Sequence, residues 1–302
     1  MLRMSGSVLN GVFCLEKPAE MTSFLCCAVM RGVLHQKKIG HAGTLDPMAT
    51  GVLPILCGNA TKAMDILPCG DKRYRAGFRL GMTSDTQDIW GNVTKTDVAK
   101  FPSADLVEAA LSPLRGDILQ VPPMTSALKK DGVRLYELAR KGVEIEREPR
   151  PVTVYELSLV SYDEQTGEGV LDCFVSKGTY VRTLCHDLGQ ALGCGAVMTA
   201  LCRTMAAGYT LADCVPLERA KTMSADELRA HLKPTETVFL PYPAVTVSAA
   251  QATRFQNGGA LSLDRLQTNV TATVRVKAPD GTFLGLGEPR DGELKVYKLF
   301  PA

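Results

Sequence analysis

Several signatures of common enzyme chemistry are missing from this 302-residue chain. It contains no P-loop and no dinucleotide-binding fingerprint, the glycine-rich patterns that cradle nucleotide phosphates. Its 10 cysteines include no C-x-x-C pair and its four histidines are dispersed, so the spacing of a zinc site is absent from the sequence. We therefore expect a protein that uses no metal and no cofactor.

Long hydrophobic runs are also missing. No uninterrupted apolar run approaches the ~18 residues that a membrane-spanning helix needs. Polar residues interrupt the N-terminal segment, where a signal peptide would need an apolar core. With 45% hydrophobic and 22% charged residues, the composition is that of a soluble globular protein. We expect a cytoplasmic protein in which scattered cysteines such as Cys14, Cys57 and Cys173 are buried, reduced thiols.

The chain has no strong excess of charge of either sign. Lysine and arginine number 34 and aspartate and glutamate 32, which gives a net charge of +2 and a pI near 8.0. Dedicated nucleic-acid-binding domains are often more basic, with a pI above about 9. An RNA partner would therefore require the positive charge to lie on one face, and the segments Lys62–Arg79 and Lys129–Arg150 are the basic stretches suited to this.

The most informative stretch that is present is His41–Lys62, which reads HAGTLDPMATGVLPILCGNATK. Pro47 biases Asp46 away from the helical region, so Asp46 is expected on an extended or turn-like loop. Gly51 allows close backbone approach, and Val52–Leu56 predicts a short buried strand. Such a sequence presents a carboxylate to a ligand, although an aspartate before proline is also typical of a simple turn.

Elsewhere, hydrophobic periodicity and capping residues predict helices interspersed with strands, and no internal repeat. Asp280-Gly281 between two apolar runs is typical of a β-hairpin, with strands over Val274–Lys277 and Phe283–Leu286. Helices are expected over 23–35, from Ser103 onward, and over 135–141, 183–192 and 223–232, and further strands over 152–160 and 170–175.

Five blocks of sequence resemble, in order, the bacterial tRNA pseudouridine synthases of the TruB family, which act on the T-loop uridine at tRNA position 55. The blocks are Gly11–Pro18, His41–Lys62, Lys72–Asp88, Gln120–Gly142, and Ser176–Gly193 followed by Leu201–Tyr209. Separate motifs that recur in one order are far more specific than any single motif.

The resemblance implies an α+β fold, with a long mixed and mainly antiparallel sheet flanked by helices. It places the catalytic domain at residues 1–240, with an RNA-binding flap inserted at 126–151. A small β-barrel-like module of the PUA type would follow at 244–302. The alternative is that this last segment is a structural cap that binds no RNA, since such a cap would show a similar strand pattern.

The same resemblance assigns the catalytic roles. Asp46 is the catalytic carboxylate, and three routes stay open to it: attack on C1′, addition to C6, or removal of a proton from C2′. Each route needs an ionised carboxylate, so a desolvating pocket must supply a cation, and Arg182 is the family's partner for this purpose. Tyr74 would stack on the flipped uracil. Outside the family context, Arg182 would be interpreted as a surface ion-pair residue and Tyr74 as a half-buried sheet residue.

The resemblance further implies a set of residues that contact the substrate or the RNA. His41 would fill the space that the flipped nucleotide leaves, and Leu201 would pack against the target base. The remaining candidates for RNA contact are Asp88, Lys17, Arg73, Lys129 and Lys130. The implied partner is the T arm of tRNA, recognised without a guide RNA, a membrane or a second subunit.

Two other classes of function are weighed against this interpretation. A tRNA-binding or tRNA-folding chaperone on the same scaffold would be expected to lack Asp46, Arg182 or Tyr74, and all three are present. A glycoside hydrolase would need two opposed carboxylates, and no second acidic residue occupies a comparable motif.

Overall fold

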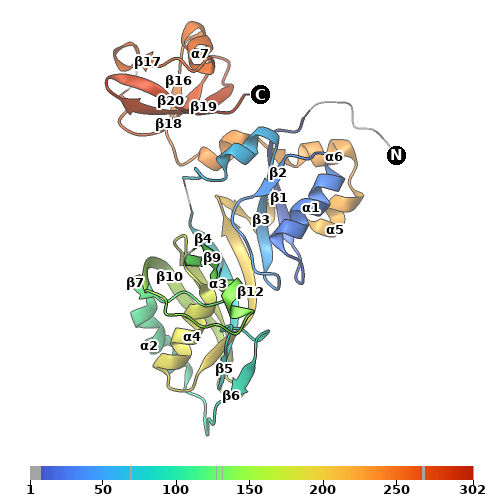
Figure 1. Ribbon diagram of the computed structural model, residues 1–302, viewed down its shortest axis with the longest axis vertical. Coiled ribbons are helices and arrows are strands. Elements are labelled where there is room, and N and C mark those ends of the chain that lie inside the picture. The colour runs from blue at the N-terminus through green and yellow to red at the C-terminus, as the bar shows by residue number, and fades with distance from the viewer. Residues whose placement is uncertain (1–7, 69, 127, 131, 267–268, 302) are drawn as a thin grey trace. The chain divides into compact units, whose positions relative to one another are not determined.

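The structure is a computed structural model that describes residues 8–68, 70–126, 128–130, 132–266 and 269–301 (Figure 1). Cys69, and Ala127 and Asp131 of the expected flap, lie outside these residues. The described residues fall into two compact units. The first takes its residues from 1–47, 52–69 and 207–302, and the second from 48–51 and 70–206.

The second unit is built on an antiparallel sheet in the order β12-β4-β11-β10-β7. Helix α4 packs on β12 and β4, and helix α2 packs on β10 and α4. A hairpin of β5 and β6 follows β4. The bounds are β4 Lys72–Leu80, β5 Met82–Ser84, β6 Val93–Lys95, α2 Ala104–Leu111, β7 Gly116–Gln120, β10 Arg150–Asp163, β11 Glu168–Val175, α4 Val181–Ala191 and β12 Ala196–Ala206.

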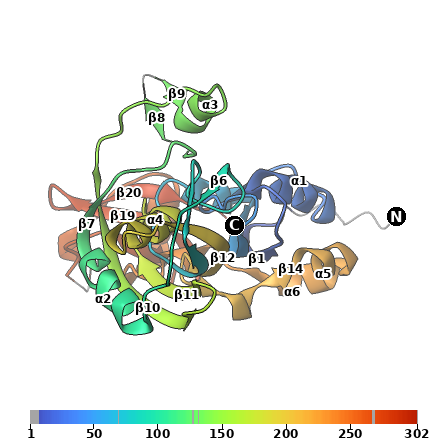
Figure 2. The ribbon, with the colours of Figure 1, turned by 90° about the horizontal axis from the view of Figure 1, so that it is seen from below.

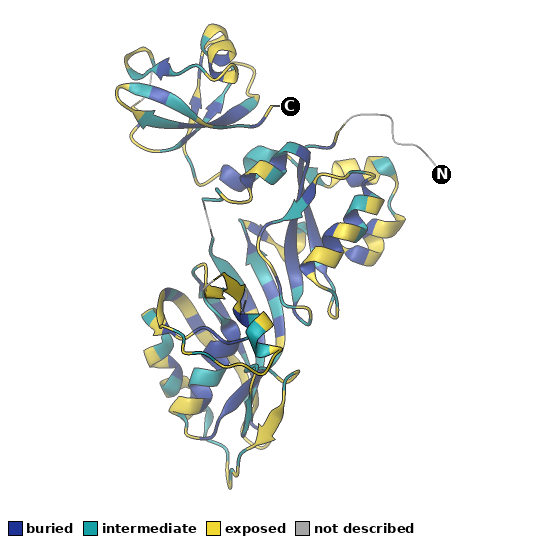
Figure 3. Cartoon of the chain, in the orientation of Figure 1, coloured by how far each residue is buried: buried dark blue, intermediate teal, exposed yellow. Residues whose placement is uncertain are grey.

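The expected flap lies between β7 and β10 of this unit. It contains a short hairpin, whose strands β8 Lys129–Lys130 and β9 Val133–Arg134 have two residues each, and the short helix α3 Leu135–Ala139. In Figure 2 these elements stand clear of the sheet that carries them. In Figure 3 most of the flap is coloured as exposed.

The first unit contains β1, which pairs in parallel with β14 and antiparallel with β15, and β2, which pairs antiparallel with β3. Helix α1 packs over a core that includes Phe13, Met30 and Leu53. The bounds are β1 Gly11–Lys17, α1 Ser23–Val33, β2 Ile39–His41, β3 Thr50–Cys57, β13 Tyr209–Thr210, β14 Val215–Pro216, α5 Leu217–Thr222, α6 Ala225–Ala230 and β15 Leu232–Lys233.

The C-terminal module has a five-stranded sheet in the order β16-β18-β19-β20-β17 and its own apolar core around Phe255 and Val276. The predicted hairpin is confirmed, because β18 and β19 pair antiparallel and Gly281 takes a φ of +86° in the turn. The bounds are β16 Ala244–Thr246, α7 Ala249–Gln256, β17 Leu261–Ser262, β18 Val274–Lys277, β19 Phe283–Arg290 and β20 Glu293–Leu299.

The predicted α+β class is confirmed, with a mixed and mainly antiparallel arrangement of strands, helices packed on it and a small C-terminal β module. Several helix boundaries differ from expectation: α1 ends at Val33 and α3 at Ala139, each two residues earlier than predicted. Helix α4 begins at Val181, so Arg182 lies in its first turn. The helix expected over 223–232 is shortened to α6, because Met223 is extended, Ser224 caps α6 with a capping box to Glu227, and Leu232 lies in β15.

The prediction of buried, reduced cysteines is confirmed for the described part of the chain. Nine cysteines are described there, all of them are free thiols, and seven are buried. Among the same residues, no helix is long and apolar enough to cross a membrane.

Candidate active site

Asp46 lies on the loop between β2 and β3, half-buried between the buried Leu45 and the exposed Pro47. The loop is fixed from α1: Leu45 N donates to Ser23 Oγ at 2.9 Å, and Ser23 Oγ donates to Leu45 O at 3.1 Å. Two reciprocal hydrogen bonds hold the residue next to Asp46, so the position of its backbone is set by tertiary structure as well as by Pro47.

Lys17 holds the other side of this loop. Its ammonium donates to the carbonyl oxygens of Pro18, Met21 and Pro47 at 2.7, 2.6 and 2.9 Å. An ammonium has three N–H donors, and these three carbonyls match them. The side chain is fully buried. In this structure the lysine braces the carbonyl of the residue that follows Asp46, and its contact with RNA stays a prediction.

His41 is the last residue of β2 and pairs with Ile55 of β3. It is half-buried, and it begins the loop that leads to Asp46. The same unit therefore carries both residues on one short connection, while the contact of His41 with RNA stays a prediction.

Tyr74 and Leu201 meet on one face of the sheet in the second unit. In the register of β4 and β12, Tyr74 lies opposite Arg203 and Ala76 lies opposite Leu201. Residues two apart on a strand share a face, and directly paired residues do too. Tyr74 and Leu201 each retain 8% of their exposed surface. The sheet thus gathers the two predicted base-contacting residues.

Arg203 shares this face and was not predicted as a site residue. Among the residues that the structure describes it is the largest fully buried side chain, although arginine is almost never fully buried unless it is paired. A signal was available in the sequence, since an arginine two residues after Leu201 on a strand must point to the same side.

Gly51 confirms the expected close approach of backbone. It has a φ of +101°, and a Cβ built there would lie 2.3 Å from the carbonyl oxygen of Arg203. Thr50 and Gly51 pair in parallel with Cys202 and Arg203 at this point. Only glycine fits both the backbone angle and the contact.

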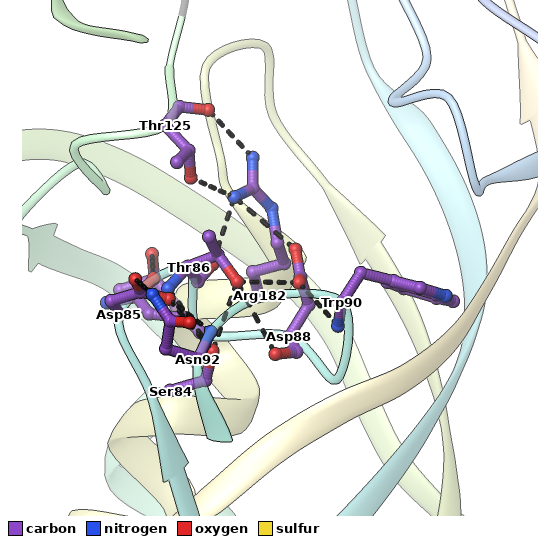
Figure 4. Close-up of polar contacts among 10 residues, drawn as sticks. Ser84, Asp85, Thr86, Asp88, Trp90, Asn92, Thr125 and Arg182 are labelled. Carbon is purple, nitrogen blue, oxygen red and sulfur yellow. Dashed lines mark hydrogen bonds and ion pairs between the residues drawn. The ribbon is translucent and has the colours of Figure 1, made fainter. Parts of the chain in front are cut away.

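Arg182 is 5% exposed and is surrounded by acceptors from two segments (Figure 4). Its Nη1 donates to Thr86 O at 3.0 Å and to Thr125 Oγ1, and its Nη2 donates to Thr125 O at 3.1 Å. The Asp88 carboxylate lies 3.7 Å from Nη1. Arginine at a helix N-terminus opposes the helix dipole, and these partners offset that placement.

Asp88 was expected to touch RNA, and the structure places it against Arg182. Its Oδ1 accepts from Thr86 Oγ1 at 2.7 Å and from Trp90 N at 3.1 Å, while Oδ2 faces the guanidinium. The carboxylate therefore holds the shape of its own loop and neutralises Arg182. Sequence reasoning missed Thr86 and Thr125, because their contributions depend on contacts made far along the chain.

Gln120 is a further residue that sequence reasoning missed. Its amide makes a reciprocal pair with the backbone of Tyr180: Nε2 donates to Tyr180 O at 3.1 Å, and Oε1 accepts from Tyr180 N at 2.7 Å. The side chain is buried. This pair ties the end of β7 to the residue before α4 and so fixes the start of the helix that carries Arg182.

Arg73 lies on the opposite face of β4 from Tyr74, as the alternation predicts. Its Nε donates to Asp172 at 2.7 Å and its Nη2 lies 2.8 Å from Glu156. The hydrogen bond to Asp172 raises the pKa of the Arg73 guanidinium. A phosphate contact at Arg73 would have to compete with these two carboxylates.

Lys129 and Lys130 are exposed on the β8–β9 hairpin of the flap. Lys130 Nζ donates to the carbonyl of Glu146, which connects the hairpin to the returning segment. Their exposure is compatible with phosphate contacts, and that role stays a prediction.

Asp46 belongs to the first unit, and Tyr74 and Arg182 belong to the second. The pairing of Asp46 with Arg182 therefore stays a prediction. Within the described ranges, no three histidine, cysteine, aspartate or glutamate side chains gather as a metal site would require.

Comparisons with known proteins cover nearly the whole chain. Residues 31–181 match the model for the TruB family pseudouridylate synthase N-terminal domain. Residues 182–240 match the tRNA pseudouridylate synthase B C-terminal domain, and residues 243–300 match the pseudouridine synthase II TruB C-terminal model.

Curated relatives agree with these family models. The chain is 42% identical over 295 residues to a tRNA pseudouridine synthase B of Azoarcus sp., which covers 97% of this chain and 95% of the relative. It is 38% identical over 294 residues to a protein of the same name from Clostridium kluyveri, covering 97% and 100%.

Among solved structures, a chain from a Cbf5–Nop10–Gar1 complex matches with a TM-score of 0.74 and 23% identity, covering 96% of this chain and 84% of that one. At this identity the match shows a shared fold alone.

Proposed function

The chain belongs to the TruB family of pseudouridylate synthases and isomerises uridine in tRNA, and from that premise we propose that its target is the T-loop uridine at position 55. The observation that carries this proposal is the GTLDP string with Asp46 on a loop braced from both sides, in a chain similar to tRNA pseudouridine synthase B over nearly its full length.

Asp46 acts as the catalytic carboxylate in this proposal. Converting uridine to pseudouridine breaks the N1–C1′ bond, turns the uracil and forms a C5–C1′ bond, after which the proton on C5 is removed. Nothing is oxidised, reduced or added, so the reaction needs no cofactor. A carboxylate at the ribose or the base, held still by Lys17 and Ser23, is what each of the three possible routes requires.

The second unit supplies the remaining groups. Tyr74 stacks on the uracil after the nucleotide leaves the helical stack, and Leu201 forms an apolar wall on the same face. Arg182 provides the cation that keeps Asp46 ionised. Its fixed position follows from Thr86, Thr125 and Asp88, which hold the guanidinium before RNA arrives.

RNA capture uses other surfaces. The exposed Lys129 and Lys130 of the flap contact phosphates, and the C-terminal module binds the RNA as a PUA-type domain. We infer that the protein acts as a monomer in the cytoplasm and that it finds its target without a guide RNA.

The test is to incubate the purified protein alone with an unmodified tRNA transcript and to map pseudouridine nucleotide by nucleotide. The expected product is a single pseudouridine in the T loop. A transcript with cytidine at that position serves as the matched control and should stay unmodified. Conversion at another site would overturn the proposed target, and tight binding without any product would favour a tRNA-folding role.

A further inference from the structure

The loop between β5 and β6 is closed by its own polar side chains. Asp85 accepts from Asn92 twice, from the backbone N at 2.8 Å and from Nδ2 at 2.7 Å. Asp88 accepts from Thr86 Oγ1 at 2.7 Å and from Trp90 N at 3.1 Å. Partial burial raises the pKa of Asp85, but the hydrogen bonds from Asn92 outweigh it and lower the pKa overall. These contacts give the loop one defined conformation.

The same loop is attached to the sheet and to α4. Ile89 N donates to Met198 O at 2.9 Å, and Met198 N donates to Gln87 O at 3.1 Å. Arg182 donates to Thr86 O at 3.0 Å. The loop is therefore ordered both by its own contacts and by its neighbours in the second unit.

This ordered loop holds two adjacent apolar side chains in water. Ile89 is 38% exposed and Trp90 is 43% exposed, and Trp90 is the only tryptophan of the chain. In Figure 4 the indole extends away from the polar cluster. A single exposed apolar residue is ordinary on a protein surface. Here an ordered loop fixes the backbone that carries the indole, so only the side-chain torsions of Trp90 need ordering when a ligand stacks on it.

The neighbours of Trp90 indicate what would stack there. Asp88 accepts from the backbone N–H of Trp90 through Oδ1 and faces Arg182 through Oδ2. One carboxylate thus connects the backbone of Trp90 to Arg182, so RNA that reaches Arg182 in the reaction comes close to the loop that carries the indole. Every nucleobase has a π face, and flipping the target unstacks the bases next to it.

We propose that Trp90 is a second stacking platform, which holds an unpaired base of the tRNA next to the flipped uridine. This inference rests on the proposed function, because it takes the ligand to be the RNA substrate. It assigns Trp90 to binding and orientation of a neighbouring base and gives it no part in bond breaking.

The sole tryptophan makes the contact directly measurable. Titration of the full-length protein with a T-arm stem-loop RNA should quench the tryptophan emission, since a stacked base quenches indole fluorescence, and every quantum of that emission comes from position 90. Unchanged emission at saturating RNA would overturn the proposal. A change that follows protein concentration without RNA would also overturn it, because it would indicate that the indole contacts another protein copy.

Substitutions at position 90 provide a second test of the stacking platform. Trp90→Ala removes the indole and retains the backbone N–H that Asp88 accepts, so Arg182 keeps its partner. We expect the variant to bind the stem-loop about 5- to 150-fold more weakly, the range of one base–aromatic stack, and Trp90→Phe to recover most of that loss. Leu106→Ala removes an exposed apolar side chain of α2 in the same unit and should bind like the wild type.

The two proposals fail in different ways. Wild-type affinity in Trp90→Ala would reject the stacking platform, and it would leave the proposed function intact if the wild type still forms pseudouridine in the T loop. Absence of pseudouridine from the wild-type reaction would reject the function whatever the fluorescence shows. Thermal unfolding of each variant identifies any loss of affinity that is due to misfolding, and Trp90→Phe keeps the test decisive in that case.

Discussion

The Arg182 guanidinium lies 3.7 Å from the Asp88 carboxylate, measured from Nη1 to Oδ2, and both side chains are largely removed from water. A buried charge is stable only with partners, and Thr86 and Thr125 supply further acceptors. The arginine proposed to serve catalysis is thus already positioned in the free protein. The side chain loses its conformational entropy when the protein folds, and not when RNA binds.

Replacing this arginine should therefore affect chemistry more than affinity. We expect Arg182→Leu to lower the single-turnover rate by at least about 100-fold, since removal of one preorganised charge typically has that effect. The dissociation constant for tRNA should change only a few-fold, because a side chain this deeply buried offers little surface to the RNA. Filter binding and single-turnover kinetics measure the two quantities. Equal losses in both would reassign Arg182 to binding.

Removing the charge of Asp46 should separate binding from catalysis even more clearly. Asp46→Asn keeps the shape of the side chain and the hydrogen bonds of Leu45 and Pro47 to their neighbours. We expect tRNA affinity close to that of the wild type and no pseudouridine after prolonged incubation, because each route needs an ionised carboxylate. Continued conversion of the T-loop uridine by this variant would exclude Asp46 as the catalytic group.

The brace under the loop predicts a stability effect. Lys17→Met removes a fully buried ammonium and the three hydrogen bonds that it donates to backbone carbonyls, so we expect the free energy of unfolding to fall by about 2–5 kcal/mol. Activity should fall as well, since the loop that carries Asp46 loses its support. Lys38→Met, at an exposed lysine of the same unit, is the control. Urea unfolding measures both, and equal midpoints would show that the three hydrogen bonds contribute little.

The effect of the close contact at Gly51 on stability can be measured separately from the effect of its backbone angle. Gly178 has a similar φ of +95° with open space around its Cβ position, whereas a Cβ at Gly51 would meet Arg203 O. We expect Gly178→Ala to cost about 1–2 kcal/mol for the left-handed angle. Gly51→Ala should cost more, because β3 and β12 must also move apart. Equal losses of thermal stability would mean that the strands yield without strain.

The buried thiols predict a loss of stability in alkali. Desolvation by burial raises the pKa of Cys57 from 9.0 to about 12 and that of Cys27 to about 11. Above pH 9 the unfolded chain releases these protons while the folded protein retains them, so stability falls as pH rises. Each thiol contributes about 1.4 kcal/mol per pH unit in that interval. Urea midpoints at about pH 8 and about pH 10 measure the slope.

One variant isolates this effect from other titrating groups. Cys57→Ala removes one of the thiols, so its stability should be lower at about pH 8 but should decline less steeply with pH than that of the wild type. The same slope in both proteins would show that Cys57 ionises freely in the folded state.

Sequence was sufficient for features that depend on neighbouring residues. Pro47 and Gly51 predicted the loop and the close backbone approach around Asp46, and Asp280-Gly281 predicted the β18–β19 hairpin. A helix starting at residue 23 was predicted, and the Thr22 side chain caps it by accepting from Leu25 N at 3.0 Å. Local backbone preference decides all of these positions.

Sequence was insufficient where a side chain takes its partner from far along the chain. Lys17 could be recognised as a cation, but one of its acceptors, the Pro47 carbonyl, is brought beside it only by folding. The same holds for Asp88 with Arg182 and for Gln120 with Tyr180. Strand register also decides which residues of neighbouring strands share a face, and it brings Arg203 opposite Tyr74.

The support that Lys17 and Ser23 give to the loop means that the signature string is not a portable catalytic unit. A peptide of residues 41–62, or a graft of them onto a foreign scaffold, would carry the carboxylate without the two side chains that anchor it from outside. The loop can therefore hold Asp46 in its catalytic position only after β1, α1 and β3 have folded around it.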